Sequence, residues 1–585
     1  MCGGLLGIGE YLRSKNVPQA FVPVITLSII GCLMFGAGML NVMPAMVWGI
    51  CLAGWCVFIC VKHRGRDTCC NRVSDKLSLI WIVIGVYLLY YCCHGVYQDG
   101  DTMTHWGVVL REIYENNRLP NFSTREVAYT SYPTGMAGYL YYFLYFVGYS
   151  EACAMFFQGV FVAASLLPLM EYVRAENQKT YWLQTAICCV VLVYSLNFNV
   201  RLADMKVDNV LGVLCFAGIA MGSCASMTLK ARVFCALPIL GMLAIIKNSG
   251  LIYCVFMAMP LVYAVLCEKQ TWRIKLAQCG AMLITPLSLT YLWKCHVAMV
   301  FSNGNMSRHS ASLDYMMQVY KSKTSEELLT ILNNYMSIWF STSSSRNGSA
   351  EWMVIFLFIG MLGLGVCVRK RLFGKGNSEG VIALAVLGGY ISYKIALLGM
   401  YLFNMPDEDA LGMGSYLRYT DSVLIILFLC MVMYFLSLLR DLNNSCGVKC
   451  KIEKTFVICL GVFMVAALPW TRPQYFKDLI RPDYENDGCY RQLLQIQQEN
   501  HLPKKNGRVL VYTHTQYSGF YVEYCFRSPD AYSVNAESID RAFTQTPDYY
   551  DYLVVLDHDE LIDEVLMKYG YPTDVKCITL NRNEE

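Results

Sequence analysis

Two aspartates and a histidine lie close together in the stretch YQDGDTMTHWG, residues 97–107. Asp99 and Asp101 are two residues apart, and His105 follows four residues after Asp101. An ionised carboxylate can take a proton from a hydroxyl or an amine, and paired carboxylates can instead hold a hard divalent cation. The stretch is therefore a candidate for acid–base or metal chemistry, if other charged side chains reach the same place.

Further charged residues follow at positions where the chain leaves apolar runs. A second acidic stretch, RLADMKVDN (201–209), contains Asp204 and Asp208. The cations are Lys247 in AIIKNSG, Lys394 inside GGYISYKIALLGMYLF and Arg418 in GSYLRY. A charge inside an apolar segment is costly and usually faces a partner or a cavity. Simpler interpretations remain open for several of these residues, since the lysine and arginine side chains can snorkel to the interface, the aspartates can solvate a helix end, and His105 can be a polar anchor.

The composition shows which elements must position these charges. Of 585 residues, 56% are hydrophobic and 16% charged, and the mean hydropathy is +0.38, which excludes an ordinary soluble enzyme of this size. The net charge of +3 is scattered, so a nucleic-acid partner has no electrostatic support. The 27 cysteines lie mostly in apolar runs without zinc-site spacing, which favours packing.

Apolar segments long enough to cross a bilayer core of ~30 Å recur along the chain. About thirteen are predicted: Phe21–Leu40, Met43–Val61, Leu77–Tyr97, Glu151–Val173, Tyr181–Phe198, Val210–Met227, Val233–Ile246, Leu251–Leu266, Leu276–Val300, Trp352–Val368, Gly380–Phe403, Ser422–Leu439 and Thr455–Trp470. Lys and Arg concentrate in alternate short loops, such as KHRGRD (62–67), LKAR (229–232) and RKRLFGKG (369–376). By the positive-inside rule these loops and the N-terminus are cytoplasmic. Both acidic stretches and everything after Trp470 are then outside.

Three parts are expected along the chain: an N-terminal helical hairpin (1–76), a transmembrane module (77–470) and a soluble outer domain (471–585). The apolar segment that starts at Tyr132 is placed along the outer interface, because a crossing there would invert the later loops. In the last part, 507–513 and 551–557 have the pattern of buried strands, and 490–501 and 559–570 that of amphipathic helices. The expected fold is thus a polytopic α-helical membrane protein with a small extracytoplasmic C-terminal α/β domain.

Carboxylates beside cations at the depth of lipid headgroups suit a reaction on a lipid phosphate. Cations would hold the departing phosphate, where charge builds up in the transition state, and Asp101 would take the proton of the attacking acceptor. We expect Lys247, Lys394 and Arg418 to contact the phosphate, and Asp204 and Asp208 to belong to the same substrate and lipid-phosphate site. No cofactor is required by this scheme, although Asp99, Asp101, Asp204 and Asp208 could hold a divalent cation such as Mg²⁺ or Mn²⁺.

These stretches resemble the GT-C integral-membrane glycosyltransferases, which use polyprenyl-phosphate-linked sugars. The resemblance rests on the order of DGDTMTHW, YPTG (132–135), ADMKVD and KNSG, and MPDEDALGMGSYLRY (405–419) is similar to bacterial members related to protein O-mannosyltransferases and aminoarabinose transferases. It implies that Asp101 is catalytic with His105 four positions later, that Tyr132 belongs to the substrate site and that Lys247 lies near the lipid phosphate. Thr102 stands where many relatives have Glu, so Asp99 would supply the second carboxylate.

The sequence therefore predicts an inverting GT-C-type hexosyl or pentosyl transferase in the plasma membrane of a bacterium. It would pass a sugar from a polyprenyl phosphate to a surface glycan, lipid or protein on the outer side. The alternatives are a transporter or flippase of lipid-linked saccharides and a non-catalytic scaffold. A transporter is expected to have symmetric halves and broken helices. Replacing Asp101 by Asn distinguishes an enzyme from a scaffold.

Overall fold

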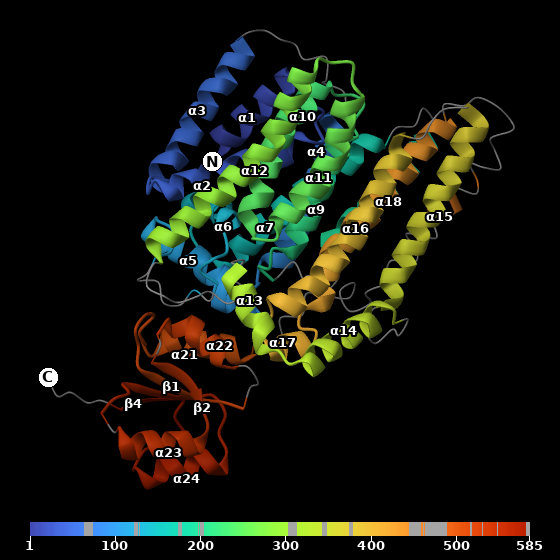
Figure 1. Ribbon diagram of the computed structural model, residues 1–585. Helices are drawn as coiled ribbons and strands as arrows, with labels where there is room; N and C mark the ends of the chain where they lie inside the picture. The colour runs from blue at the N-terminus through green and yellow to red at the C-terminus, as the bar shows by residue number, and fades with distance from the viewer. Residues whose placement is uncertain are drawn as a thin grey trace.

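The computed structural model contains a large helical bundle and a small α/β unit at one end of it (Figure 1). It describes residues 1–63, 74–121, 127, 129–173, 178–196, 198, 204–301, 313–341, 348–373, 378–443, 455, 458–459, 461, 488–514, 518–528, 530–546 and 548–580. Among these residues, nine helices are long and apolar enough to cross a membrane, and three shorter apolar helices accompany them. The chain is an integral membrane protein.

The bundle is built from helices of very different length. They are α1 (Cys2–Ser14), α2 (Val22–Met39), α3 (Met43–His63), α4 (Ser74–Cys92), η1 (Thr102–Trp106), α5 (Gly107–Asn116), α6 (Gly135–Val147), α7 (Glu151–Leu166), η2 (Leu167–Tyr172), α8 (Gln178–Leu196), α9 (Asp208–Gly222), α10 (Leu229–Ile246), α11 (Gly250–Cys267), α12 (Trp272–Val300), α13 (Leu313–Ser322), α14 (Ser325–Trp339), α15 (Gly348–Phe373), α16 (Ser378–Phe403), α17 (Asp407–Leu411) and α18 (Tyr416–Asn443).

Each of the first twelve predicted segments coincides with an apolar helix of the structure. The thirteenth, Thr455–Trp470, lies mostly outside the described residues. The segment that starts at Tyr132 forms α6, whose residues 135–144 are all buried, with contacts to α2, α5, α7 and α10. Thirteen residues of helix extend over ~20 Å, which is too short for the bilayer core.

Helix α1 was not predicted, because its sequence CGGLLGIGEYLRS is rich in glycine, which disfavours helices in isolation. Its stability comes from packing on α3, where small residues let the two backbones touch. A Cβ atom built on Gly7 would lie 2.0 Å from the carbonyl oxygen of Gly54, so neither position has room for a side chain.

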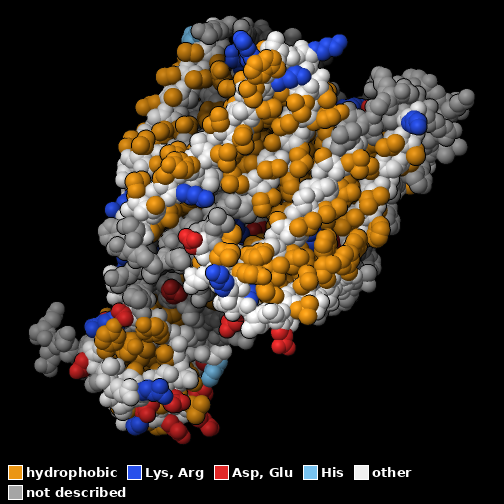
Figure 2. Space-filling view, in the orientation of Figure 1, with side chains coloured by type: hydrophobic (Ala, Val, Ile, Leu, Met, Phe, Trp, Pro, Cys, Tyr) orange, Lys and Arg blue, Asp and Glu red, His pale blue; other side chains and the backbone are white. Residues whose placement is uncertain are grey.

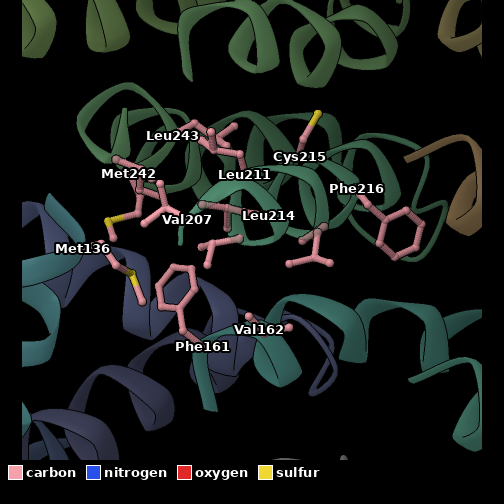
Figure 3. Close-up of a cluster of buried hydrophobic side chains, with 14 of the residues drawn as sticks. Met136, Phe161, Val162, Val207, Leu211, Leu214, Cys215, Phe216, Met242 and Leu243 are labelled. Carbon is pink, nitrogen blue, oxygen red and sulfur yellow. The ribbon is translucent and has the colours of Figure 1, made fainter. Parts of the chain in front are cut away.

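The centre of the bundle is α9, in which every residue is buried. Figure 3 shows part of this core, where Leu211 and Leu214 of α9 face Phe161 of α7, with Met136 of α6 and Met242 of α10 beside them. A helix buried on all sides is held rigidly by its neighbours. The first residue of α9 is Asp208, so the core fixes the position of a carboxylate predicted to be functional.

The outer surface of the bundle is apolar, as expected for helices in lipid. Figure 2 shows hydrophobic side chains covering most of the viewed face of the bundle, with a few scattered Lys and Arg side chains, and acidic and basic groups together on the α/β unit. On α12 the exposed side chains include Leu276, Leu283, Ile284, Leu287 and Tyr291.

The C-terminal unit has a four-stranded sheet in the order β2-β1-β3-β4. β1 (Val509–Tyr512) pairs in parallel with β2 (Ala531–Val534) and β3 (Tyr552–Val555), and β4 (Cys577–Thr579) is antiparallel to β3. Its helices are α21 (Gly488–Glu499), α22 (Ser518–Phe526), α23 (Ala536–Gln545) and α24 (Glu560–Lys568). The predicted strands at 507–513 and 551–557 and the predicted helices at 490–501 and 559–570 are confirmed. Helices α22 and α23 and the short strands β2 and β4 were not predicted.

Candidate functional site

The two acidic stretches lie side by side, at the end of the bundle that carries the α/β unit. Asp99 contacts Lys206 with 2.8 Å between the carboxylate oxygen and the ammonium. Thr102 donates a hydrogen bond to Asp99, and its hydroxyl accepts one of 3.2 Å from the backbone N–H of Met205. Asp204 lies close enough to Lys206 to help raise the lysine pKa, against the opposing effect of burial. Hydrogen bonds thus join the 99–102 loop to the 204–206 loop.

Four charged residues form a continuous chain of ion pairs, which we call the ion-pair chain: Asp101, Arg418, Asp208 and Lys247. Arg418 donates through Nη1 to Asp101, and its Nε lies 3.5 Å from a carboxylate oxygen of Asp208. The other carboxylate oxygen of Asp208 accepts a 2.8 Å hydrogen bond from Lys247. The residues come from four separate places in the sequence, so tertiary packing alone brings them together.

A close contact between α9 and α18 holds two members of the ion-pair chain together. Asp208 lies in the first turn of α9 and Arg418 in the first turn of α18. Four residues further along each helix, a Cβ on Gly212 would come within 2.4 Å of the carbonyl oxygen of Ser422. Gly212 therefore lets the backbones approach, and residues four apart share a helix face.

Lys247 is held at the end of α10 by a tight turn into α11. A Cβ on Gly250 would lie 1.9 Å from the carbonyl oxygen of Leu243, so the turn accepts only glycine there. The Lys247 ammonium lies 5.7 Å from the centre of the Tyr132 ring and 5.2 Å from that of Tyr419, within the range of cation–π attraction. Tyr132, which the family resemblance placed in the substrate site, is thus next to the ion-pair chain.

Exposure is highest at the Asp101 end of the ion-pair chain and lowest at Asp208. The side chains of Asp101, Arg418 and Lys247 are 34%, 18% and 8% exposed, and that of Asp208 is 5% exposed. Partial burial opposes ionisation of Asp101, but the charge and hydrogen bond of Arg418, together with Lys206 and Lys247, outweigh it and hold the pKa of Asp101 below its usual value. Asp101 is therefore an ionised carboxylate at neutral pH and the most accessible member of the chain.

His105 lies in a cluster of aromatic rings. It is 2% exposed and makes edge contacts with Trp106, Tyr129 and Tyr132. Burial lowers the pKa of His105 to about 3, so the ring is neutral at pH 7. Its Nδ1 is buried and has no hydrogen-bond partner among the described residues. His105 belongs to one π-helical turn, a local feature that often occurs at functional sites.

Lys394 pairs with a carboxylate outside the ion-pair chain. Its ammonium lies 3.1 Å from Glu351 and donates to the hydroxyls of Tyr416 at 2.5 Å and Thr420 at 3.1 Å. With 0% of the side chain exposed, this buried pair links α16 to α15 and to the first turn of α18. A cleft of about 470 Å³ opens between α14 and the turn before α18, lined by Asn334, Ile338, Leu411, Gly412, Met413, Ser415, Tyr416 and Leu417.

Several residues of the site were missed from the sequence. Lys206 lies within the quoted stretch ADMKVD, but its pairing with Asp99 depends on how two loops meet. Thr102 appeared as a departure from the family pattern and in fact connects these loops. Glu351 follows a polar loop and gave no signal of burial, and Tyr419, whose ring lies beside Lys247, was not singled out.

The carboxylates do not fit a divalent cation. Among the described residues, no three His, Cys, Asp or Glu side chains are grouped so that they could hold a metal ion. Asp99, Asp101 and Asp208 each contact a Lys or Arg instead. These contacts place a positive charge beside each of the three carboxylates.

No family model matches the sequence, and no curated protein matches it either. Among solved structures, the fold is similar to ArnT from Cupriavidus metallidurans bound to undecaprenyl phosphate, with a TM-score of 0.48 and 11% identity over 87% of this chain and 99% of that chain. The apo state of the same protein gives a TM-score of 0.36 and 12% identity over 85% and 95% of the two chains. Similarities of this degree do not assign an activity to the chain.

Proposed function

We propose that this protein is an inverting membrane glycosyltransferase that uses a polyprenyl-phosphate-linked sugar. The observation that carries the proposal is the ion-pair chain. In it the accessible carboxylate of Asp101 contacts the guanidinium of Arg418, and Asp208 links Arg418 to the ammonium of Lys247. A proton acceptor beside two cations is what sugar transfer from a phosphate needs. The order of the motifs in the sequence supports the same class of enzyme.

In this mechanism Asp101 takes the proton from the acceptor hydroxyl or amine. The acceptor atom forms a bond to the anomeric carbon on the face opposite the phosphate, and the bond from that carbon to the phosphate oxygen breaks. The electron pair leaves with the lipid phosphate, whose growing charge Arg418 and Lys247 stabilise. Because Arg418 already contacts both Asp101 and Asp208, it can turn toward the phosphate while Asp208 keeps it in place.

The other predicted residues take supporting roles in the proposal. Asp99 and Lys206 hold the loop on which Asp101 lies, and Asp204 favours the charged form of Lys206. Tyr132 and His105 form the aromatic wall beside Lys247. Lys394 acts indirectly, because its hydrogen bond to Tyr416 fixes the helical turn that carries Arg418. The cleft of about 470 Å³ extends to Leu417, next to Arg418, and has the size of a ligand pocket.

The reaction takes place on the outer side of the plasma membrane in this proposal. Helix α10 begins at the basic loop LKAR and ends just before Lys247, and 18 helical residues separate the two by ~27 Å, about one bilayer core. The positive-inside rule places the basic end in the cytoplasm, and hence the ion-pair chain and the α/β unit outside. The chain then divides into a hairpin (1–76), a catalytic membrane module (77–470) and an outer domain (471–585), and the acceptor is a surface glycan, lipid or protein.

The proposal is tested with Asp101→Asn in membrane vesicles. The vesicles receive undecaprenyl-phosphate hexoses and pentoses with radiolabelled sugars, and label leaving the lipid carrier is measured. Loss of a general base slows a reaction by ~10²–10⁴-fold, so the variant should show almost no transfer while it folds and inserts normally. Asp540→Asn, on the surface of the C-terminal unit, is the control with unchanged transfer.

Two outcomes would reject the enzyme. Wild-type transfer by Asp101→Asn would remove the proposed base, and absence of transfer by the wild-type protein with the whole panel would favour a scaffold. A transporter would instead move the intact lipid-linked sugar across the vesicle membrane, which a membrane-impermeant sugar-oxidising reagent detects.

A further inference from the structure

Helix α22 of the C-terminal unit lies against the catalytic loop, residues 98–101, whose last two residues, Gly100 and Asp101, already have helical backbone geometry. It contacts η1, and the ring of Phe520 covers the backbone between the two aspartates of the loop. A Cβ built on Gly100 would lie 3.0 Å and 3.1 Å from two ring atoms of Phe520. The ring therefore limits how far Gly100, and with it Asp101, can move outward.

The other end of α22 is held by α5, which continues from η1. Arg527 donates to Glu112 at 3.0 Å and to Glu115 at 2.7 Å. Arg111 donates to the carbonyl oxygen of Tyr524 at 3.2 Å, and its guanidinium lies 5.3 Å from the centre of that ring. Arg111 is favourable here, because a cation stabilises the last carbonyl groups of a helix. Replacing Arg527 by a neutral residue would leave the buried carboxylate of Glu112 without its closest cation.

The same unit also reaches the residue that precedes the loop. Tyr490 of α21 donates a 2.6 Å hydrogen bond to Glu151, whose other carboxylate oxygen accepts a 2.7 Å hydrogen bond from the backbone N–H of Tyr97. Tyr524 makes an edge contact with the ring of Tyr97. Contacts from α21, α22 and Arg527 therefore restrain the Asp99–Asp101 segment at the residue before it, over its backbone and at the helix that follows it. Figure 1 shows α21 and α22 as the part of the C-terminal unit next to the bundle.

We propose that α22 is a positioning element of the catalytic loop, with Phe520 and Arg527 as positioning residues that set the place of Asp101 without touching the donor. This inference rests on the proposed function of Asp101. Asp101 lies in the terminal turn of a helical segment, and helix ends fray unless side chains around them restrict their movement. The outer domain then acts on the turnover rate rather than on binding of the lipid.

The test uses full-length protein and two independent readouts. The first is hydrogen–deuterium exchange of the backbone amides in residues 97–107, which requires no substrate. The second is the split between kcat and KM for the radiolabelled undecaprenyl-phosphate sugars. Phe520→Ala should exchange faster in this segment and lose kcat by about tenfold or more with KM unchanged, because small misplacements of a reacting group are costly.

Matched variants separate positioning from a general loss of structure. Phe520→Tyr keeps the ring and should restore the wild-type values. Arg527→Gln loosens the opposite end of α22 and should reproduce the kcat defect. Tyr532→Ala is matched in exposure, because 46% of Tyr532 and 39% of Phe520 are exposed. It removes a ring on β2 and should change neither readout.

Each other outcome overturns the inference. Wild-type exchange in Phe520→Ala shows that the ring does not restrain the loop, and faster exchange with unchanged kcat shows that the restraint has no catalytic effect. A rise in KM with unchanged kcat would mean that Phe520 contacts the donor. If the wild-type protein transfers no sugar, the proposed function fails, whereas the exchange measurement still decides whether α22 restrains the loop.

Discussion

Replacing Gly212 by Ala tests whether the contact between α9 and α18 positions Arg418. The new Cβ would lie 2.4 Å from the carbonyl oxygen of Ser422 and 2.5 Å from a methyl group of Ile425. The helices must therefore separate by about 1 Å to restore a normal contact. Asp208 and Arg418 lie one turn away on the same two helices, so this separation reaches their ion pair.

The size of the effect follows from the distance. The pair is 3.5 Å apart, and a separation of about 4.5 Å weakens its attraction by about 1 kcal/mol at an effective dielectric constant of about 20. Because a 1 Å misplacement can cost ~10²-fold in rate, transfer should fall by roughly five- to a hundredfold.

The assay is sugar transfer from undecaprenyl phosphate in vesicles, with the thermal unfolding midpoint measured in parallel. Gly388→Ala in α16 is the matched control, because a Cβ there meets nothing within 4 Å and should leave transfer unchanged. Wild-type transfer by Gly212→Ala would show that the spacing of α9 and α18 does not position the cation.

Two further predictions concern the charges themselves. Arg418→Gln removes the main influence that lowers the pKa of Asp101, so this pKa should rise. Because a base works only above its pKa, the acid limb of the pH–rate profile should move to higher pH. An unmoved limb would mean that another group limits the rate. Lys394→Met leaves the buried carboxylate of Glu351 without its ammonium partner and should lower stability by ~3 kcal/mol, which thermal unfolding measures. The double variant with Glu351→Gln should regain most of this loss, and equal unfolding midpoints for the single and double variants would contradict the pairing.

The sequence alone determined the architecture of this protein to a large extent. Twelve of the thirteen predicted apolar segments are helices in the structure, because the length of an apolar run is a local property that the bilayer imposes. The two central strands of the C-terminal unit were predictable for a similar reason, since their buried residues are consecutive in the chain. The glycine-rich α1 was not, because its stability depends on α3.

Tertiary structure alone decided which charges meet. Lys394 and Arg418 look alike in the sequence, as cations within or beside apolar segments, yet Lys394 pairs with Glu351 while Arg418 lies between Asp101 and Asp208. Arg418 reaches Asp208 because α9 and α18 touch at Gly212 and Ser422, which are about two hundred positions apart in the chain. Packing of this kind depends on shape rather than on local pattern, so only the folded molecule shows it.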